Sequence, residues 1–487
     1  MSTSIGDVLK GTGMYTLASV LARSVGFLVI PLYVLAFSRA EYGVMGILDV
    51  VVSIGAKIVA LGLVGVQTRR LFDRPEDGDA DAMARFICSA NLLMLVAWGI
   101  LTALLVAGLP LMQGLLDSKG VVLDWRYVLA ITATLGLIAF KEMTFGYFVA
   151  IRRYATASIF TVVQSLAFVG FLYLFLQVFK AGVPGRYFAQ ALGCLLLLAC
   201  LYIPYLRPWI RKGGWSSKEA RFGLIIGAPV IFHMICNEVI TASDRYVMLG
   251  MHVPLEEIGA YTLGYQLGMG LSLLTHSFNK AWVPNYYRLA DVPDDEARQV
   301  IGKACAGWVL LVGGGCLTIC FLSEPLVYLL ASEGYVRAIR VLPLICVSYY
   351  FHGLYMMYVN PVLEEYKTGT MLRVTLTVAG VNIVANILLV PEYGIFGAAA
   401  STLGCGVLQA ALIYRKSRLM RGRLYSAPLL WGCGLIVLCF GCVYALPLEL
   451  RWLIKTGIWF TGCALLVIIN QKAIRTLLDW VFKKVQA

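Results

Sequence analysis

Residues 382–399 read Asn-Ile-Val-Ala-Asn-Ile-Leu-Leu-Val-Pro-Glu-Tyr-Gly-Ile-Phe-Gly-Ala-Ala and lie between two long apolar stretches. Asn382 and Asn386 are one helical turn apart, so their amides can hydrogen-bond across helices inside a membrane. Pro391 is expected to end that helix, and Gly394 permits a tight turn. The small residues after Gly394 open the next helix. The stretch therefore predicts two membrane helices joined by a short turn, which is a structural role rather than a chemical one.

The composition extends this prediction to the whole chain. Of its 487 residues, 60% are hydrophobic and only 14% are charged, and the mean hydropathy is +0.80. A soluble chain of this length would need about a quarter of its residues charged, so a soluble enzyme is excluded and lipid is the main solvent. The formal charge of +13 is explained by membrane topology rather than by nucleic acid. Because the first apolar stretch is long and carries Arg23, we expect no cleavable signal peptide.

Dividing the chain at charged and Pro/Gly breaks predicts an all-α polytopic membrane protein with about fourteen spans. They are 12–37, 42–66, 83–109, 127–150, 156–179, 186–206, 220–243, 257–283, 300–323, 338–360, 370–390, 395–414, 427–446 and 453–470. With the N-terminus in the cytoplasm, 26 Lys and Arg residues fall inside and 10 outside. The positive-inside rule therefore predicts that both termini are cytoplasmic.

A weak internal repeat divides these spans into two halves. A shift of 216 residues superposes Glu41 and Gly43 on Glu257 and Gly259, and Gly11 on Gly227. Six spans separate the copies, so the halves are expected to be parallel, with a cavity between them. The predicted domains are a six-helix lobe 1–206, a linker 207–219, a second six-helix lobe 220–424, two extra helices in 425–470, and an amphipathic interfacial tail 471–487.

Several motifs resemble lipid-linked oligosaccharide flippases of the multidrug/oligosaccharidyl-lipid/polysaccharide (MOP) exporter superfamily. The resemblance covers about residues 5–420 and rests on Gly11–Tyr15, Pro31, Glu41–Gly43, Arg69–Phe72, Asp244–Tyr246, Ile258–Tyr261, Leu329–Leu330, Tyr335, Ala338–Leu344 and Asn382–Ala399. Ala385 stands where the family often has Leu. The resemblance implies a V-shaped, MATE-like transporter that moves a polyprenyl-diphosphate-linked glycan by alternating access.

Charged residues at membrane depth are the candidate functional residues, because they are costly unless they face a cavity or one another. Arg23, Lys57 and Lys141 lie near the predicted midplane and are the candidate diphosphate ligands, with Glu142 beside Lys141. The alternative is a structural ion pair of Arg23 or Lys57 with Glu142. The candidates for coupling to a proton or sodium gradient are Glu142, Glu238 and Asp49. Further polar residues that could line a cavity are His233, Asn237, His276, Asn279 and Lys280.

No catalytic residue, cofactor or metal site is expected. The thirteen cysteines are scattered, and the closest pairs, Cys316/Cys320 and Cys439/Cys442, have no His or acidic partner at metal-site spacing. They are interpreted as small hydrophobic residues of a membrane core.

The sequence thus favours a flippase for O-antigen, capsule, exopolysaccharide or lipopolysaccharide biosynthesis in the plasma (inner) membrane, and not an enzyme. The alternatives are a peptidoglycan-precursor (lipid II) flippase, a cation-coupled multidrug exporter and, less favoured, a membrane glycan polymerase. A polymerase usually needs a sizeable outside loop, and all the predicted outside loops here are short. Expected partners are the lipid-linked glycan, membrane lipids and polysaccharide polymerase or assembly proteins, with no nucleic acid.

Overall fold

Helices account for all the regular structure in the described part of the chain. The computed structural model describes residues 25–72, 80–117, 123–151, 153–288, 294–331, 333–365, 368–421 and 451–469, with single positions 434, 436 and 471. Ten of these helical stretches are long and apolar enough to cross a membrane, and Val25–Ala36 and Thr456–Ile468 are shorter apolar helices. The predicted all-α polytopic membrane fold is confirmed. The predicted span 427–446 lies almost wholly outside the described residues, so the count of fourteen stays a prediction.

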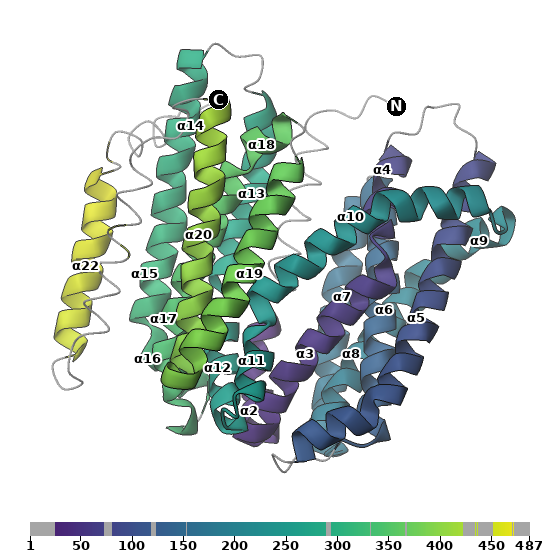
Figure 1. Ribbon diagram of the computed structural model, residues 1–487, viewed down its shortest axis with the longest axis horizontal. Helices are drawn as coiled ribbons and strands as arrows, with labels where there is room; N and C mark the ends of the chain where they lie inside the picture. The colour runs from purple at the N-terminus through teal and green to yellow at the C-terminus, as the bar shows by residue number, and fades with distance from the viewer. Residues whose placement is uncertain are drawn as a thin grey trace. The chain divides into compact units, whose positions relative to one another are not determined.

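The helices follow the predicted order along the chain (Figure 1). They are α2 (Ile30–Ala36), α3 (Arg39–Ala60), α4 (Leu63–Phe72), α5 (Ala80–Asp117), α6 (Trp125–Ala150), α7 (Tyr154–Tyr173), α8 (Gly182–Leu201), α9 (Arg207–Gly213), α10 (Ser217–Ala242), α11 (Asp244–Gly250), α12 (Leu255–Gly268), α13 (Leu271–Arg288), α14 (Asp294–Trp308), α15 (Gly314–Phe321), α16 (Ser323–Leu330), α17 (Arg337–Tyr358), α18 (Asn360–Glu364), α19 (Thr368–Tyr393), α20 (Ile395–Arg421) and α22 (Arg451–Ile469). Short π-helical turns continue α7 at Leu174–Val178, α8 at Tyr202–Leu206 and α14 at Val309–Gly313, and a 3₁₀ turn spans Glu333–Tyr335.

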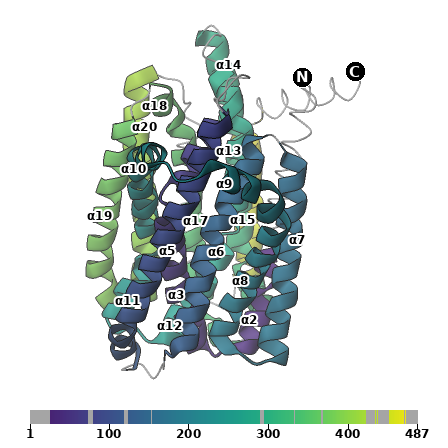
Figure 2. The same ribbon diagram turned by 90° about the vertical axis from the view of Figure 1, so that its right-hand side faces the viewer.

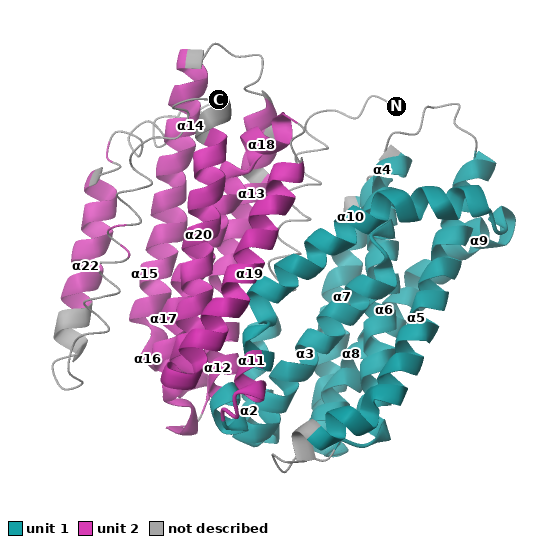
Figure 3. Ribbon diagram, viewed as in Figure 1, with its two compact units in different colours: residues 1–246, 254–259 teal, residues 247–253, 260–487 magenta. Residues whose placement is uncertain are grey.

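Two compact units divide the chain (Figure 3). Unit 1 comprises residues 1–246 and 254–259, and unit 2 comprises residues 247–253 and 260–487. In unit 1, α6 packs against α8, α3 and α4 (Figures 1 and 2). In unit 2, α20 packs along α17 and α19. The predicted lobe boundary at 207–219 stays a prediction, although α9 forms inside it and α10 belongs to unit 1.

The start of α3 shows why its first residues are polar. Ser38 caps the helix, because its hydroxyl accepts a bond from the Glu41 backbone N–H at 3.2 Å. In return the Glu41 carboxylate accepts a bond from the Ser38 backbone N–H at 2.8 Å. This reciprocal capping box satisfies donors that a helix start would otherwise leave unpaired. The repeated Glu41 therefore has a structural role at the start of α3.

The glycines of the predicted repeat meet within unit 1. A Cβ atom added to Gly43 would collide with the carbonyl oxygen of Leu255, and one added to Gly259 would collide with that of Arg39. The two collisions are reciprocal under the 216-residue shift, which relates residue 39 to 255 and residue 43 to 259. Only glycine lets two helix backbones approach this closely. The third repeated pair cannot be tested, since Gly11 lies outside the described residues.

Two predicted spans are broken rather than continuous. The predicted span 42–66 divides into α3 and α4 at Leu61 and Gly62, whose φ angles are +50° and +67°. The predicted span 257–283 was wrong as a single helix, because α12 ends at Gly268 and α13 begins at Leu271. Apolar composition continues across both breaks, so composition alone could not locate them.

The stretch 382–399 folds largely as predicted. Asn382 and Asn386 are fully buried, the Asn386 amide donates to the Asn382 carbonyl oxygen at 3.0 Å, and the Ser401 hydroxyl of α20 donates to the same oxygen at 3.3 Å. The helix ends at Tyr393, two residues after Pro391, and Gly394 makes the turn with φ +55°. The amphipathic tail predicted at 471–487 lies outside the described residues apart from position 471.

Candidate functional site

Lys57 of α3 forms an ion pair with Glu238 of α10 inside unit 1. The Lys57 ammonium also donates to the Ser53 hydroxyl one turn earlier, at 3.0 Å. The side chain of Lys57 is 26% exposed and that of Glu238 is 18% exposed. Both groups are therefore only partly shielded from solvent.

Lys141 pairs with its neighbour on α6. Its Nζ lies 3.1 Å from a Glu142 carboxylate oxygen, and the Glu142 side chain is 51% exposed. Lys57 and Lys141 thus have different carboxylate partners in the described part of the chain. Arg23, the third predicted diphosphate ligand, lies outside the described residues. The structural alternative of a pair between Lys57 and Glu142 is wrong, because Lys57 is paired with Glu238.

This pairing changes the charge balance that the sequence suggested. Counting Glu142 alone against Arg23, Lys57 and Lys141 gives a surplus of two positive charges. Glu238 pairs with Lys57 as Glu142 pairs with Lys141, so adding Glu238 to the count lowers the surplus to one. Sequence analysis assigned Glu238 to the other half, but α10 belongs to unit 1.

Asp49, a predicted coupling candidate, is held by residues that the sequence did not indicate. Its carboxylate lies 2.7 Å from the Arg186 guanidinium of α8 and accepts a bond from the Tyr187 hydroxyl at 3.1 Å. The Tyr187 hydroxyl is also 3.0 Å from the Met45 carbonyl oxygen. Arg186 is the first residue of the predicted span 186–206, and its 137-residue separation from Asp49 left no local pattern that could have paired them. The geometry fixes Asp49 as a link between α3 and α8.

A second missed contact joins α4 to α10. Arg70 forms an ion pair with the buried Glu219, and its guanidinium lies over the rings of Phe86 and Phe222 at 5.0 and 4.9 Å. Ser216 caps α10 by accepting a bond from the Glu219 N–H at 3.4 Å. Sequence analysis used Arg70 as a cytoplasmic charge and as part of the Arg69–Phe72 motif, and it predicted no partner for it. In the structure Arg70 is part of the packing of unit 1.

The remaining predicted polar residues fall into two groups. His233 and Asn237 lie on α10 in unit 1, and the buried Nδ1 atom of His233 has no hydrogen-bond partner among the described residues. His276, Asn279 and Lys280 lie on α13 in unit 2. The Nδ1 atom of His276 is 2.8 Å from the Ser272 carbonyl oxygen, which can only accept, so this nitrogen carries the proton. That bond is local to α13, because Ser272 is one turn before His276.

Comparison with known proteins identifies the family. Residues 8–289 match the family of polysaccharide biosynthesis proteins, which is more than half of the chain. No curated protein sequence matches this chain.

Solved structures show the fold. The chain is similar to a lipid II flippase, MurJ, in an inward closed conformation, with a TM-score of 0.72, 13% identity, and coverage of 94% of this chain and 99% of that one. It is also similar to a MATE multidrug resistance transporter of the MOP superfamily in an inward-facing conformation, with a TM-score of 0.64, 14% identity, and coverage of 82% and 95%. An outward-facing MATE transporter matches with a TM-score of 0.58, 14% identity, and coverage of 88% and 100%.

The sequence match, the all-helical membrane fold and these structural similarities agree with the resemblance found in the motifs. The chain belongs to the polysaccharide biosynthesis protein family, and its fold is that of the solved lipid II flippase and MATE transporter structures.

Proposed function

We propose that this protein moves a polyprenyl-diphosphate-linked oligosaccharide from the inner to the outer leaflet of the plasma (inner) membrane by alternating access, for surface polysaccharide biosynthesis. The observation that carries the proposal is the partly shielded Lys57–Glu238 pair in unit 1, whose two residues lie on helices long and apolar enough to span a membrane. Membership of the family supports the glycan as cargo, and the similarity to a lipid II flippase supports a lipid carrier. Both termini are proposed to be cytoplasmic, and a polymerase or other assembly protein would receive the cargo.

The pair provides a site where one anion replaces another. A lysine ammonium is a compact charge that binds phosphate without the planar fit of arginine. When the diphosphate displaces Glu238 from Lys57, the ion pair is exchanged rather than lost, so the charge on Lys57 stays compensated. The Ser53 hydroxyl, already 3.0 Å from Lys57 Nζ, supplies a neutral donor beside it. Arg23 and Lys141 remain proposed further ligands of the diphosphate.

The same exchange suggests how an ion gradient could drive transport. A carboxylate released from Lys57 is unpaired at membrane depth, which is costly until a cation neutralises it. Glu238 is therefore the preferred site for a coupling proton or sodium ion. Asp49 keeps a basic partner in Arg186, and Glu142 is half exposed beside Lys141. These contacts leave Asp49 and Glu142 as weaker candidates.

The pairing also bears on the two alternatives. An exporter of cationic drugs needs carboxylates that are free to attract its cargo, but Asp49, Glu142 and Glu238 each have a basic partner in the structure. This favours an anionic cargo. A lipid II flippase carries the same diphosphate and stays the second candidate, since the charges do not separate the two.

Genetic replacement separates these functions. The chain is expressed in bacterial strains that lack an O-antigen or capsule flippase, and in a strain depleted of its lipid II flippase. Restored surface polysaccharide without rescue of peptidoglycan synthesis is the expected result. Rescue of the lipid II strain alone would establish the alternative, and drug resistance without any glycan would favour the exporter.

Two variants test whether complementation depends on Lys57. Lys57→Gln should abolish complementation while the protein remains in the membrane. Lys212→Gln is the matched control, because Lys212 also pairs with a carboxylate, Asp81 at 2.8 Å, but both side chains are more than 60% exposed. Equal complementation by the two variants would remove Lys57 from the site.

A further inference from the structure

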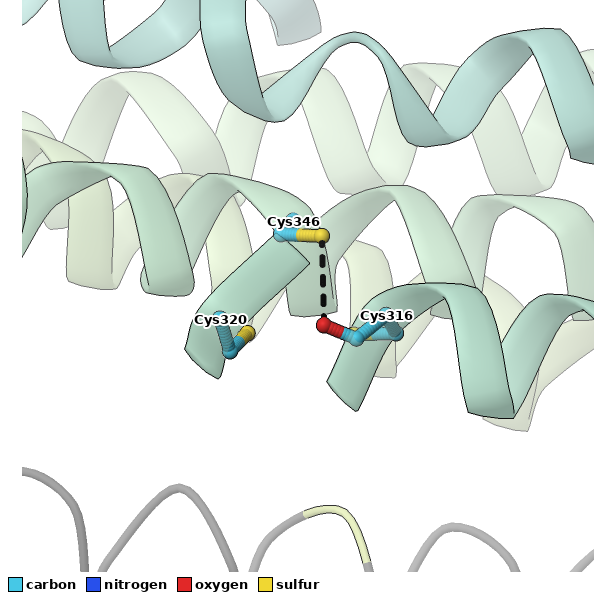
Figure 4. Close-up of side chains that lie close together, drawn as sticks. All are labelled: Cys316, Cys320 and Cys346. Carbon is cyan, nitrogen blue, oxygen red and sulfur yellow. Dashed lines mark hydrogen bonds between the residues drawn. The ribbon is translucent and has the colours of Figure 1, made fainter. Parts of the chain in front are cut away.

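Three cysteines of unit 2 gather at one point between α15 and α17 (Figure 4). Cys316 and Cys320 are one turn apart on α15, and Cys346 lies opposite them on α17. Their three Sγ atoms all lie within 4.8 Å of one another. The Cys346 Sγ atom is also 4.0 Å from the Cys316 carbonyl oxygen. Sequence spacing showed only the pair on α15, because Cys346 is 26 residues beyond Cys320 and reaches it through the packing of α15 on α17.

All three cysteines of the cluster are buried, two of them completely. Cys316 and Cys346 are fully buried, whereas Cys320 retains 7% of its surface. Small ligands would therefore reach Cys320 first. Thiolates are the ligands that soft metal ions prefer, and three sulfurs from two helices hold such an ion more strongly than one thiol can.

We propose that Cys316, Cys320 and Cys346 form a binding site for a soft monovalent cation of the Cu(I) class. A structural zinc site takes four protein ligands, and this cluster offers three. Metal–sulfur bonds of about 2.3 Å put the sulfurs of a planar three-ligand site about 4.0 Å apart. The separations here exceed that by less than one ångström at most, which side-chain adjustment can close. The bound ion would connect α15 to α17.

Charge neutrality fixes the stoichiometry of the binding reaction. A net charge in a membrane-spanning bundle is costly, so one positive ion is best balanced by one thiolate. One thiol S–H bond then breaks and one metal–sulfur bond forms, and the proton leaves to solvent. The other two sulfurs complete the coordination as neutral thiols. Binding therefore releases one proton per ion and involves no change of oxidation state.

Silver(I) is the probe, because it resembles Cu(I) and is not oxidised in air. The purified full-length protein in lipid nanodiscs is titrated with Ag⁺ in excess monothiol, which competes the ion away from single cysteines. The readouts are the ions retained per chain, the protons released and the melting temperature. The expected result is one Ag⁺ and one proton per chain, with a raised melting temperature. Retention of no ion by the wild-type protein would overturn the proposal.

Matched variants assign the ion to the cluster. Cys346→Ala should weaken Ag⁺ binding by at least about tenfold. Cys405→Ala is the control, because Cys405 is also buried with its Sγ atom 4.0 Å from a backbone carbonyl oxygen but lies outside the cluster. If Cys346→Ala does not fold, Cys320→Ser tests the same loss at the most accessible sulfur. Wild-type affinity in a folded cluster variant would refute the site.

Discussion

At the scale of single residues, the ion pair between Lys57 and Glu238 is expected to stabilise the folded protein. Removing one charge leaves the other shielded and uncompensated, which should cost about 1–3 kcal/mol for a pair that is partly exposed. Lys57→Gln and Glu238→Gln should therefore each lower the melting temperature of the purified protein. The double variant should recover most of that loss, because no charge is left alone. Additive losses in the double variant would show that the two side chains do not interact.

Both residues were recognisable in the sequence, but their partnership was not. Counting about 1.5 Å per residue along straight helices puts Lys57 about 14 Å and Glu238 about 27 Å from the cytoplasmic helix ends. This estimate places Lys57 and Glu238 at different depths in the membrane. The chain breaks at Leu61–Gly62 after α3, and Pro229 lies within α10. The helices that carry Lys57 and Glu238 are therefore not straight rods, so counting residues misplaces the two side chains. A contact over 181 residues has no local sequence signal.

Tyr187 allows a test of the Asp49 link. Tyr187→Phe removes the hydroxyl that lies near Asp49 and the Met45 carbonyl oxygen. Loss of a buried hydrogen bond costs about 1–2 kcal/mol, so the melting temperature should fall while transport per folded molecule is unchanged. A transport defect without a loss of stability would instead return Asp49 to the coupling candidates.

At the scale of helices, Gly43 and Gly259 allow α3 to approach residues 255–259 closely within unit 1. Gly43→Ala places a methyl group against the Leu255 carbonyl oxygen and should destabilise the protein by about 1–3 kcal/mol. Gly99→Ala on α5 is the control, because a Cβ there meets nothing within 4 Å and alanine favours the helix. Thermal melts of the two variants compare them, and equal melting temperatures would contradict the close approach.

Elements were predictable where composition changes at their ends. The stretch 382–399 carries its own helix end, turn and helix start, and it folded within two residues of the prediction. The break between α12 and α13 was missed because the apolar pattern continues through Met269 and Gly270. Backbone bonds from Met269 N–H to the Tyr265 oxygen and from Gly270 N–H to the Leu267 oxygen close the turn there. Gly268 and Gly270 flank the break, but glycine also occurs within unbroken helix, as at Gly264 of α12, so these glycines alone did not mark the helix end.

At the scale of the whole molecule, the distribution of Lys and Arg predicts the membrane topology. Basic residues predict a cytoplasmic N-terminus by 26 to 10. In a variant without other reactive cysteines, Ser217→Cys should react with a membrane-impermeant thiol reagent only after cells are opened, and Ser118→Cys should react in intact cells. Ser118 lies outside the described residues, so this experiment tests the sequence prediction. The opposite labelling pattern would reverse the assigned direction of transport.

The most direct test of the central claim follows a lipid across a bilayer. Purified protein is reconstituted in vesicles that contain a labelled polyprenyl-diphosphate-linked oligosaccharide, and its exposure on the outer leaflet is measured over time. The wild-type protein and Lys212→Gln should both move the lipid, whereas Lys57→Gln should be slower by at least about tenfold, the equivalent of about 1.4 kcal/mol. Movement no faster than in vesicles without protein, or a Lys57→Gln rate equal to wild type, would contradict the account.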